Sequence, residues 1–312
     1  MTRAVLGIDT SNYTTSCALL CGEEIFQQKR LLAVPGGQIG LRQSDAVFAH
    51  VKALGELTER LMAQNAASEL AAVGVSDAPR RTEGSYMPCF LAGVMAARVT
   101  AAAMRLPLFT FAHQQGHIAA ALFGAGRLDL LHQRFVAFHL SGGTTECVLV
   151  EELPAGKLTL LSATNDLNAG QVVDRVGRML GLPFPAGPAL DALARQSDAR
   201  ARIRPSFRNG NPCLSGVENQ CSAMLMRGEA PCDIARFCID SISASLLQMA
   251  QNAISETGCD TLLFAGGVMS NSIIRPELER RLGGIFAPST FSCDNAAGIA
   301  VLAADAAGML LD

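Results

Sequence analysis

Short apolar runs and longer periodic stretches alternate along the first third of the chain. Short apolar runs that end in polar turns predict strands at residues 4–11, 14–20, 70–79 and 107–113. Apolar positions that recur every three or four residues predict helices at residues 44–66, with Ser44 as the N-cap, and at residues 89–106. This mixture of strands and helices is typical of the α/β class.

One strand–turn–strand pattern occurs twice in the chain. Residues 135–152, FVAFHLSGGTTECVLVEE, repeat the plan of residues 4–24, AVLGIDTSNYTTSCALLCGEE. Each has an apolar strand, a turn of small polar residues, the pair Thr-Thr, one further residue and then Cys. Cys17 therefore aligns with Cys147. The repeat predicts two similar α/β domains.

The rest of the second half alternates helices with one further strand. Residues 172–196 predict a helix, a turn at LPFPAGP and a second helix that begins near Asp191. Residues 235–258 predict an amphipathic helix that ends at Gly258. Residues 260–282 predict a strand, a Gly-Gly turn and a helix, and an Ala-rich helix follows the polar turn near Asp294.

Length and charge limit the possible functions. The 312 residues, 49% of them hydrophobic, are enough for two medium-sized globular domains. The net charge of −3 argues against a protein that binds nucleic acid over its whole surface. One basic run, ARQSDARARIRPSFR, is either solvated surface or a site for a phosphate-rich or acidic partner. Its arginines are Arg195, Arg200, Arg202, Arg204 and Arg208.

The ten cysteines are scattered and form no C-x-x-C pair, which indicates reduced thiols. We recognise neither a signal peptide nor an apolar run long enough to span a membrane. We therefore expect a cytoplasmic protein with no membrane partner.

Three turns have the composition of a nucleotide site. Small residues let backbone N–H groups and hydroxyls approach phosphate oxygens closely. Such turns also occur often between a strand and the next element without any ligand. Their occurrence in a duplicated strand–turn–strand pattern favours a nucleotide-binding site. The turns are Asp9-Thr10-Ser11, Ser141-Gly142-Gly143-Thr144 and Gly266-Gly267.

His113 and His117 lie four residues apart in FAHQQGHIAAALF, a spacing that places two imidazoles on one helix face. They are either an ordinary polar pair or two ligands of a metal ion, with Asp294 as the best candidate for a third. The zinc-protease motif H-E-x-x-H has the same spacing, but Gln114 stands where that motif has its catalytic glutamate. A peptidase is therefore disfavoured.

Asp174 and Asp191 flank the LPFPAGPALD turn and could hold ribose hydroxyls or metal-bound phosphates. For Asp191 the alternative is an N-cap. We interpret His50, His132 and His139 as structural.

Six motifs, in this order and spacing, resemble the TsaD/Gcp family of tRNA threonylcarbamoyladenosine biosynthesis, formerly catalogued as O-sialoglycoprotein endopeptidases. The motifs are GIDTS, HQQGH, LSGGTTE, VVDRVGRMLGLPFPAGPALDALA, FAGGVMSN and CDNAAGIA. The resemblance implies the actin-like ATPase (ASKHA, duplicated RNase H-like) fold, an α/β fold of two domains with a cleft between them. Residues 1–115, completed by the C-terminal helix 294–312, would form the first domain, and residues 116–293 the second.

The resemblance also implies an activity. Family members transfer a threonylcarbamoyl group from threonylcarbamoyl-AMP to N6 of adenosine 37 in tRNA. They work with a smaller TsaB-like paralogue and a TsaE-like ATPase, which would be the partners of this chain. Direct contact with tRNA and a dimer are both possible here. The expected cofactors are one divalent metal, iron or zinc, and an adenylate of the ATP or AMP type.

The site residues that the resemblance implies fall into three groups. His113, His117 and Asp294 would hold the metal. Ser141, Gly142 and Gly143 would face the acyl-phosphate, and Asp174, Gly187, Asp191 and Asn271 would line the adenylate pocket.

The sequence departs from the family pattern around the reacting groups. Thr144 stands where the family has a histidine, LSGVENQ lacks the family's lysine, and EGSYMPCFLAG replaces a Gly-Pro-Gly loop. The family's Cys-Asp-Glu-Thr after the Thr-Ser turn is Asn-Tyr-Thr-Thr here, and the Pro-Glu expected near residue 36 is missing. A second hypothesis is therefore a divergent paralogue that binds a nucleotide but has a regulatory or scaffold role.

Overall fold

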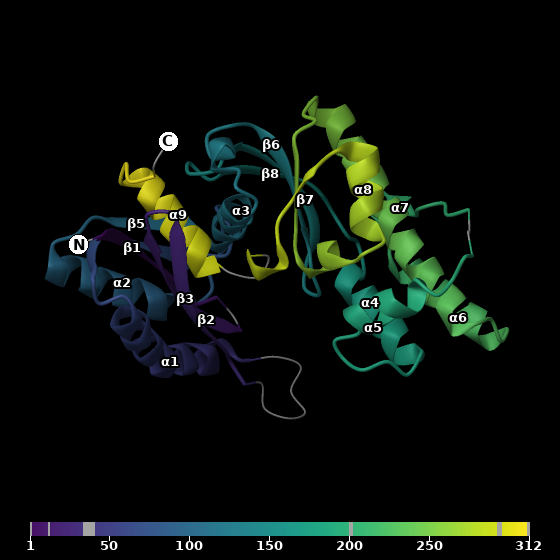
Figure 1. Ribbon diagram of the computed structural model, residues 1–312, viewed down its shortest axis with the longest axis horizontal. Helices are drawn as coiled ribbons and strands as arrows, with labels where there is room; N and C mark the ends of the chain where they lie inside the picture. Colours follow the sequence, from purple (N-terminus) through teal and green to yellow (C-terminus); the bar gives the residue numbers. More distant parts are fainter. Residues whose placement is uncertain (1, 12, 34–40, 200–201, 292–294, 311–312) are drawn as a thin grey trace. The chain divides into compact units, whose positions relative to one another are not determined.

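The structure is a computed structural model that describes the chain except for residues 1, 12, 34–40, 200–201, 292–294 and 311–312. It divides into two compact units (Figure 1). Unit 1 comprises Met1–His132, Glu152–Lys157 and Cys293–Asp312, and unit 2 comprises Gln133–Glu151 and Leu158–Ser292. The predicted division between residues 115 and 116 falls within a helix that unit 1 contains whole.

Unit 1 is built on a mixed sheet with the strand order β3-β2-β1-β4-β5. The first three strands are antiparallel neighbours, whereas β4 runs parallel to β1 and β5 parallel to β4. The carboxyl ends of β1, β4 and β5 therefore lie at one edge of the sheet. The strands are β1 (Thr2–Asp9), β2 (Thr14–Cys21), β3 (Glu24–Leu31), β4 (Ser68–Ala78) and β5 (Leu108–Ala112).

Helices cover both faces of the unit 1 sheet. Leu6 and Ile8 of β1 pack in one apolar core with Leu54 of α1 and Ala97 of α2. The alternate residue Gly7 faces α9, where a Cβ would collide with the carbonyl oxygen of Ala296. Figure 1 shows α9, the yellow helix, among the purple and blue elements of unit 1. The helices of this unit are α1 (Gln43–Gln64), α2 (Phe90–Met104), α3 (His113–Gly124), the 3-10 turn η1 (Leu128–Leu130) and α9 (Asn295–Ala306).

The prediction of Ser44 as the N-cap of the first helix is wrong. Helix α1 begins at Gln43, and Arg42 has the extended backbone of an N-cap residue, with φ −64° and ψ 146°. Ser44 already lies in the first helical turn. Its hydroxyl contacts the adjacent Asp45 carboxylate, at 3.4 Å, instead of a backbone N–H.

Unit 2 contains a second five-stranded sheet with the order β12-β11-β6-β7-β8, the same arrangement as in unit 1. Cys147 pairs with Phe138 as Cys17 pairs with Ile8, so the two hairpins have the same register. The repeat read from the sequence is therefore confirmed. The strands are β6 (Phe135–Leu140), β7 (Thr145–Glu152), β8 (Lys157–Ala163), β11 (Leu262–Ala265) and β12 (Ile285–Phe286).

The core of unit 2 lies between this sheet and its helices. The rings of Phe138, Phe264 and Phe286 stack across three neighbouring strands, with centroids 4.7 and 4.8 Å apart. Helix α7 ends at Gly258 in the left-handed conformation, as predicted. The further elements are α4 (Ala169–Met179), α5 (Gly187–Ala194), β9 (Phe207–Arg208), β10 (Asn211–Pro212), α6 (Ser215–Met226), α7 (Pro231–Thr257), η2 (Gly267–Ser270), α8 (Ile274–Leu282) and η3 (Ser289–Phe291).

The prediction of a helix that begins near Asp191 is also wrong. Helix α5 begins at Gly187, because the fixed φ of Pro188 favours the first turn of a helix. Asp191 lies inside this helix, so the N-cap interpretation of its carboxylate is wrong too.

Two general properties follow from the described residues. None of the cysteines among them forms a disulfide. Across the same residues, every helix is too short or too polar to cross a membrane.

Candidate functional site

The carboxyl-end edge of the unit 1 sheet brings Asp9 to His113. Asp9 is the last residue of β1, and His113 directly follows β5 as the first residue of α3. The Nδ1–H of His113 donates to Oδ2 of Asp9 at 2.8 Å, and the backbone N–H of Ser11 donates to Oδ1 at 2.9 Å. Both carboxylate oxygens of Asp9 are therefore hydrogen-bonded within unit 1.

Asp9 is fully buried but remains a carboxylate. Burial alone would raise the pKa of Asp9, but the attraction and hydrogen bond of His113 and the N–H of Ser11 outweigh it, so the pKa is lowered. An ionised Asp9 accepts the N–H on Nδ1 of His113, so Nε2 is the nitrogen of His113 that is left for a ligand.

His117 lies one helical turn after His113, as the spacing predicts. The two ring centroids are 4.6 Å apart with an interplanar angle of 74°. The His113 side chain is 22% exposed and His117 is half-buried, so both rings lie near the surface of unit 1. Two adjacent imidazoles, one with its second nitrogen on a carboxylate, fit the usual surroundings of metal-ligating histidines.

The proposed third ligand, Asp294, lies outside the described residues. Within the described residues, no group of three or more His, Cys, Asp or Glu side chains has the arrangement of a metal site. The described chain thus contributes a pair of imidazoles, and a complete metal site stays a prediction.

Gln115 fixes the helix that carries the histidines. Its Oε1 accepts the N–H of Ala112 at 2.8 Å, and its Nε2 donates to the carbonyl of Leu153 at 2.7 Å. The amide is buried, with 1% exposure. This role of Gln115 was not predicted from the sequence, although a Gln in the first turn of a helix is a known capping signal.

A close helix contact supports α3 from the other side. A Cβ on Gly298 of α9 would collide with the carbonyl oxygen of Gly116, which lies between the two histidines in the sequence. Only glycine at position 298 allows the two backbones to approach so closely.

In unit 2, the glycine turn after β6 is closed by its own serine. Ser141 Oγ accepts the N–H groups of Gly143 and Thr144 at 3.2 and 3.1 Å. Gly142 and Gly143 are exposed, with open space where a Cβ would lie. A ligand could therefore approach the turn closely. Because the Ser141 oxygen accepts both N–H groups, its hydroxyl hydrogen can still be donated to that ligand.

The first turn of α4 packs against this glycine turn. The N–H of Gly170 donates to the carbonyl of Ser141 at 3.2 Å, and a Cβ on Gly170 would lie 2.7 Å from the nitrogen of Gly142. Thr145 Oγ1 accepts the N–H of Ala169 at 2.8 Å. Gly170 and Thr145 position the turn, and the sequence analysis missed both. The glycine at the second position of α4 was the sequence signal that could have indicated this close contact.

The two glycines after β11 have different surroundings. Gly266 has φ +102°, and a Cβ there would collide with the carbonyl oxygen of Leu140 at the end of β6. This glycine is required by the packing of two parallel strand ends. Gly267 is exposed with open space around it, so it is the one that a ligand could approach.

The two half-buried aspartates of unit 2 hold neighbouring loops. Asp191 accepts the Ser272 hydroxyl at 2.9 Å and its N–H at 3.1 Å. Asp174 accepts the N–H of Ala186 at 2.8 Å and so fixes the start of α5 beside Gly187. Asn271 Oδ1 accepts the first two N–H groups of the helical segment that follows it, both at 3.0 Å. The structure thereby brings Asp191 next to the Asn271–Ser272 loop and Asp174 next to Gly187.

The remaining histidines lie outside this set of residues. Nδ1 of the buried His50 lies 2.8 Å from the hydroxyl of Thr15, and His132 Nε2 lies 2.9 Å from a carboxylate oxygen of Asp305. His139 is half-buried in β6, opposite Glu146 of β7.

Comparison with known families decides the classification. The model of TsaD, tRNA N6-adenosine threonylcarbamoyltransferase, matches residues 20–301. The chain belongs to the TsaD family. Its relatives include the tRNA N6-adenosine threonylcarbamoyltransferase of Thermus thermophilus, 32% identical over 310 residues, which are 96% of this chain and 91% of that protein. The protein of the same name from Gloeobacter violaceus is 31% identical over 264 residues, 80% of this chain and 74% of that one.

Solved structures confirm the expected actin-like ATPase fold of this TsaD-family chain. HypF of T. kodakarensis superposes with a TM-score of 0.63 at 10% identity, over 99% of this chain and 48% of that one. Component A of the Acidaminococcus fermentans (R)-2-hydroxyglutaryl-CoA dehydratase gives a TM-score of 0.57 at 19% identity, over 98% and 100%. At these identities the likeness shows the fold alone.

Proposed function

We propose that this chain transfers a threonylcarbamoyl group from threonylcarbamoyl-AMP to N6 of adenosine 37 in tRNA, with AMP as the leaving group. Membership of a transferase family supports the reaction type. The observation that carries the proposal is the His113–His117 pair, with Asp9 holding His113, at the carboxyl-end edge of a sheet in an actin-like fold.

His113 and His117, with Asp294, would hold one iron or zinc ion. The buried Asp9 carboxylate supports this assignment, because it fixes the tautomer in which Nε2 of His113 is a ligand. A bound ion would supply Lewis-acid polarisation of the acyl donor. Gln114 follows His113, so the motif offers no carboxylate to deprotonate a water, and acyl transfer is favoured over hydrolysis.

Unit 2 would hold the adenylate. Gly142, Gly143 and Gly267 leave room for a phosphate at the backbone, and the Ser141 hydroxyl can donate to one of its oxygens. Asp191 and Asn271 meet at one loop, where they could orient the nucleoside. The contribution of these residues would be positioning, which can supply a large part of the rate of a group transfer.

The test is transfer to tRNA in a purified system with threonylcarbamoyl-AMP and the partner proteins. We expect the wild type to form threonylcarbamoyladenosine and His113→Ala to lose most of it. His132→Ala is the matched control, because His132 is an exposed histidine of the same unit with its own partner. A wild type that forms no more product than His113→Ala would contradict the proposal.

A second candidate function is nucleotide binding without transfer. Thr144 replaces a histidine of the family pattern, and the segment that lacks the family's lysine begins α6, where Asp166 accepts the N–H and hydroxyl of Ser215. AMP binding by a protein that makes no product would favour this alternative.

We further propose that the outer face of α1 and α2 binds the smaller TsaB-like paralogue. Phe48, Val51, Leu91, Met95 and Val99 are each at least half exposed on these two helices. A groove of about 550 Å³ lies between the helices, and most of its lining is apolar. An apolar patch rimmed by polar residues is typical of a protein interface. A paralogue of the same fold could present its own helix pair to this face.

A further inference from the structure

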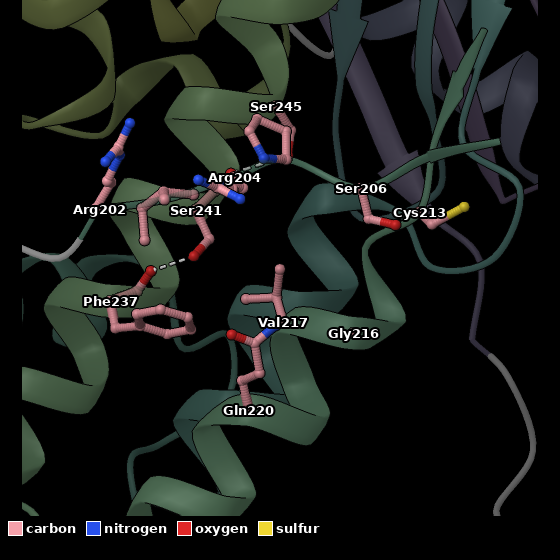
Figure 2. A pocket seen from close by; sticks show the side chains of 12 residues that line it. Arg202, Arg204, Ser206, Cys213, Gly216, Val217, Gln220, Phe237, Ser241 and Ser245 are labelled. Carbon is pink, nitrogen blue, oxygen red and sulfur yellow. Dashed lines mark hydrogen bonds between the residues drawn. The ribbon is translucent and has the colours of Figure 1, made fainter.

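A small polar pocket lies in unit 2, away from the turns described above. Figure 2 shows its side chains on three elements: Arg202, Arg204 and Ser206 on an extended segment, Gln220 on α6, and Ser241 and Ser245 on α7. The pocket has a volume of about 80 Å³. Of the described residues that line it, none is an aspartate or a glutamate.

The two arginines of the pocket have no counter-charge. Arg202 and Arg204 are exposed, and within the described residues neither guanidinium has a hydrogen bond or ion pair. Several other surface arginines are paired, as Arg227 is with Glu229 at 2.6 Å and Arg275 with Glu279 at 2.7 Å. Residues 194–208 hold five arginines and one aspartate in a chain of net charge −3. Of these, Arg195 pairs with Asp191 at 3.7 Å, so among the described arginines the unneutralised positive charge at the pocket is that of Arg202 and Arg204.

Two buried serines of α7 also line the pocket. Ser241 and Ser245 are each 3% exposed, and their hydroxyl hydrogens are already donated to the carbonyls of Phe237 and Ser241 at 2.7 and 2.9 Å. The donors that remain in the lining are the Gln220 amide, the Ser206 hydroxyl and the two guanidinium groups. Donors without acidic neighbours favour an anion over a cation.

The size of the pocket suits a small anion. On the measure that gives about 80 Å³, about 10–15 Å³ is enough for one water, so the pocket has room for several waters. A group of the size of a phosphate fits in this space. Guanidinium groups bind phosphate through two N–H donors at once, which a lysine cannot do.

We propose that this pocket and its two arginines hold a backbone phosphate of tRNA. The inference rests on the proposed function, since tRNA is the substrate there. Phosphate contacts of this kind position a nucleic acid without reading its sequence. They would let unit 2 hold the body of the tRNA while the adenosine is presented elsewhere.

The first test compares two charge reversals of equal size. R202E/R204E removes the proposed contact, and R3E/R134E reverses two other exposed arginines whose guanidinium groups have no partner among the described residues. We measure tRNA affinity by fluorescence anisotropy over a series of salt concentrations. R202E/R204E should raise Kd at least about tenfold at low salt and lower the slope of log K against log salt by about two. R3E/R134E should stay close to the wild type.

The second test separates the pocket from general charge. Gln220 and the adjacent Asn219 are both exposed on α6, but only Gln220 lines the pocket. Q220E and N219E add the same charge one residue apart, and only Q220E should strongly weaken tRNA binding. Equal effects of the two, or wild-type affinity of R202E/R204E, would overturn the inference. The inference would also be overturned if R202E/R204E no longer bound inorganic phosphate but kept the affinity of the wild type for tRNA. The pocket would then hold a free anion and not a phosphate of the tRNA.

The transfer assay distinguishes failure of this inference from failure of the proposed function. If the wild type modifies tRNA and R202E/R204E binds and modifies it equally well, the pocket assignment is wrong and the function stands. If the wild type binds tRNA through these arginines but never modifies it, the proposed transferase function is wrong, and the proposed phosphate contact is retained.

Discussion

Asp9 and His113 join the ends of two strands that are more than a hundred residues apart in sequence. Asp9→Asn keeps the shape of the side chain but removes the charge that holds the imidazole proton on Nδ1. Loss of such a carboxylate typically lowers metal affinity about 10–100-fold. We expect that loss for iron or zinc in chelator competition, with the exposed Asp45→Asn as control. Equal affinity of Asp9→Asn and the wild type would show that Asp9 does not support a metal ligand.

His50 is a buried histidine with a consequence for stability. Burial lowers the pKa of His50 from 6.5 to about 4, against a smaller raising effect of the Asp9 charge. Between these two pH values the unfolded chain binds a proton that the folded chain does not. The free energy of unfolding should therefore fall as the pH is lowered from about 6.5 to about 4.

His50→Gln keeps a hydrogen-bonding group near Thr15 and removes the titration. Urea unfolding across this pH range should give a flatter dependence on pH for the variant than for the wild type. Parallel pH profiles would mean that folding does not lower the pKa of His50.

At the scale of elements, helices α3 and α9 form the tightest contact near the histidine pair. Gly298→Ala would place a methyl group on the backbone of Gly116, and such overpacking costs about 1–3 kcal/mol of unfolding free energy. Gly55→Ala in α1 meets nothing within 4 Å and should raise stability by about 0.5–1 kcal/mol. Urea unfolding measures both. A Gly298→Ala protein as stable as Gly55→Ala would contradict the close packing of α3 and α9.

Elements with strong periodicity could be predicted from the sequence, and elements fixed by tertiary contacts could not. The strands β1, β2, β4 and β5 and the helix α7 follow from apolar patterns and a terminal glycine. Strand β3 could not be predicted, because its alternating polar residues lie at a sheet edge and are half exposed. Helix α6 could not be predicted either, because its first turn depends on the distant Asp166.

The candidate site shows the same division. Residue spacing predicted that His113 and His117 share a helix face, because that relation is local. The bond from His113 to Asp9 and the bond from Ser272 to Asp191 are long-range, so no local pattern shows them. Pairing in a sheet and packing of loops decide which of the candidate residues meet.

At the scale of the whole molecule, the exposed face of α1 and α2 should determine assembly. Val99→Glu places a charge on this face, where Val99 is 60% exposed, so it should leave the fold intact and weaken binding of the TsaB-like paralogue at least about tenfold. Met226→Glu, at an 80% exposed position on α6, is the matched control. Light scattering and calorimetry measure the association. Equal binding by both variants, or a second copy of this chain bound at the face, would contradict the proposed partner.

The central claim is that this TsaD-family chain still performs the transfer. The most direct measurement is the amount of threonylcarbamoyladenosine formed in tRNA per AMP released from threonylcarbamoyl-AMP. Our account predicts one modified adenosine for each AMP, and loss of both products in His117→Ala. Binding of AMP by the wild type without any modified adenosine would contradict the account and identify the chain as a nucleotide-binding paralogue.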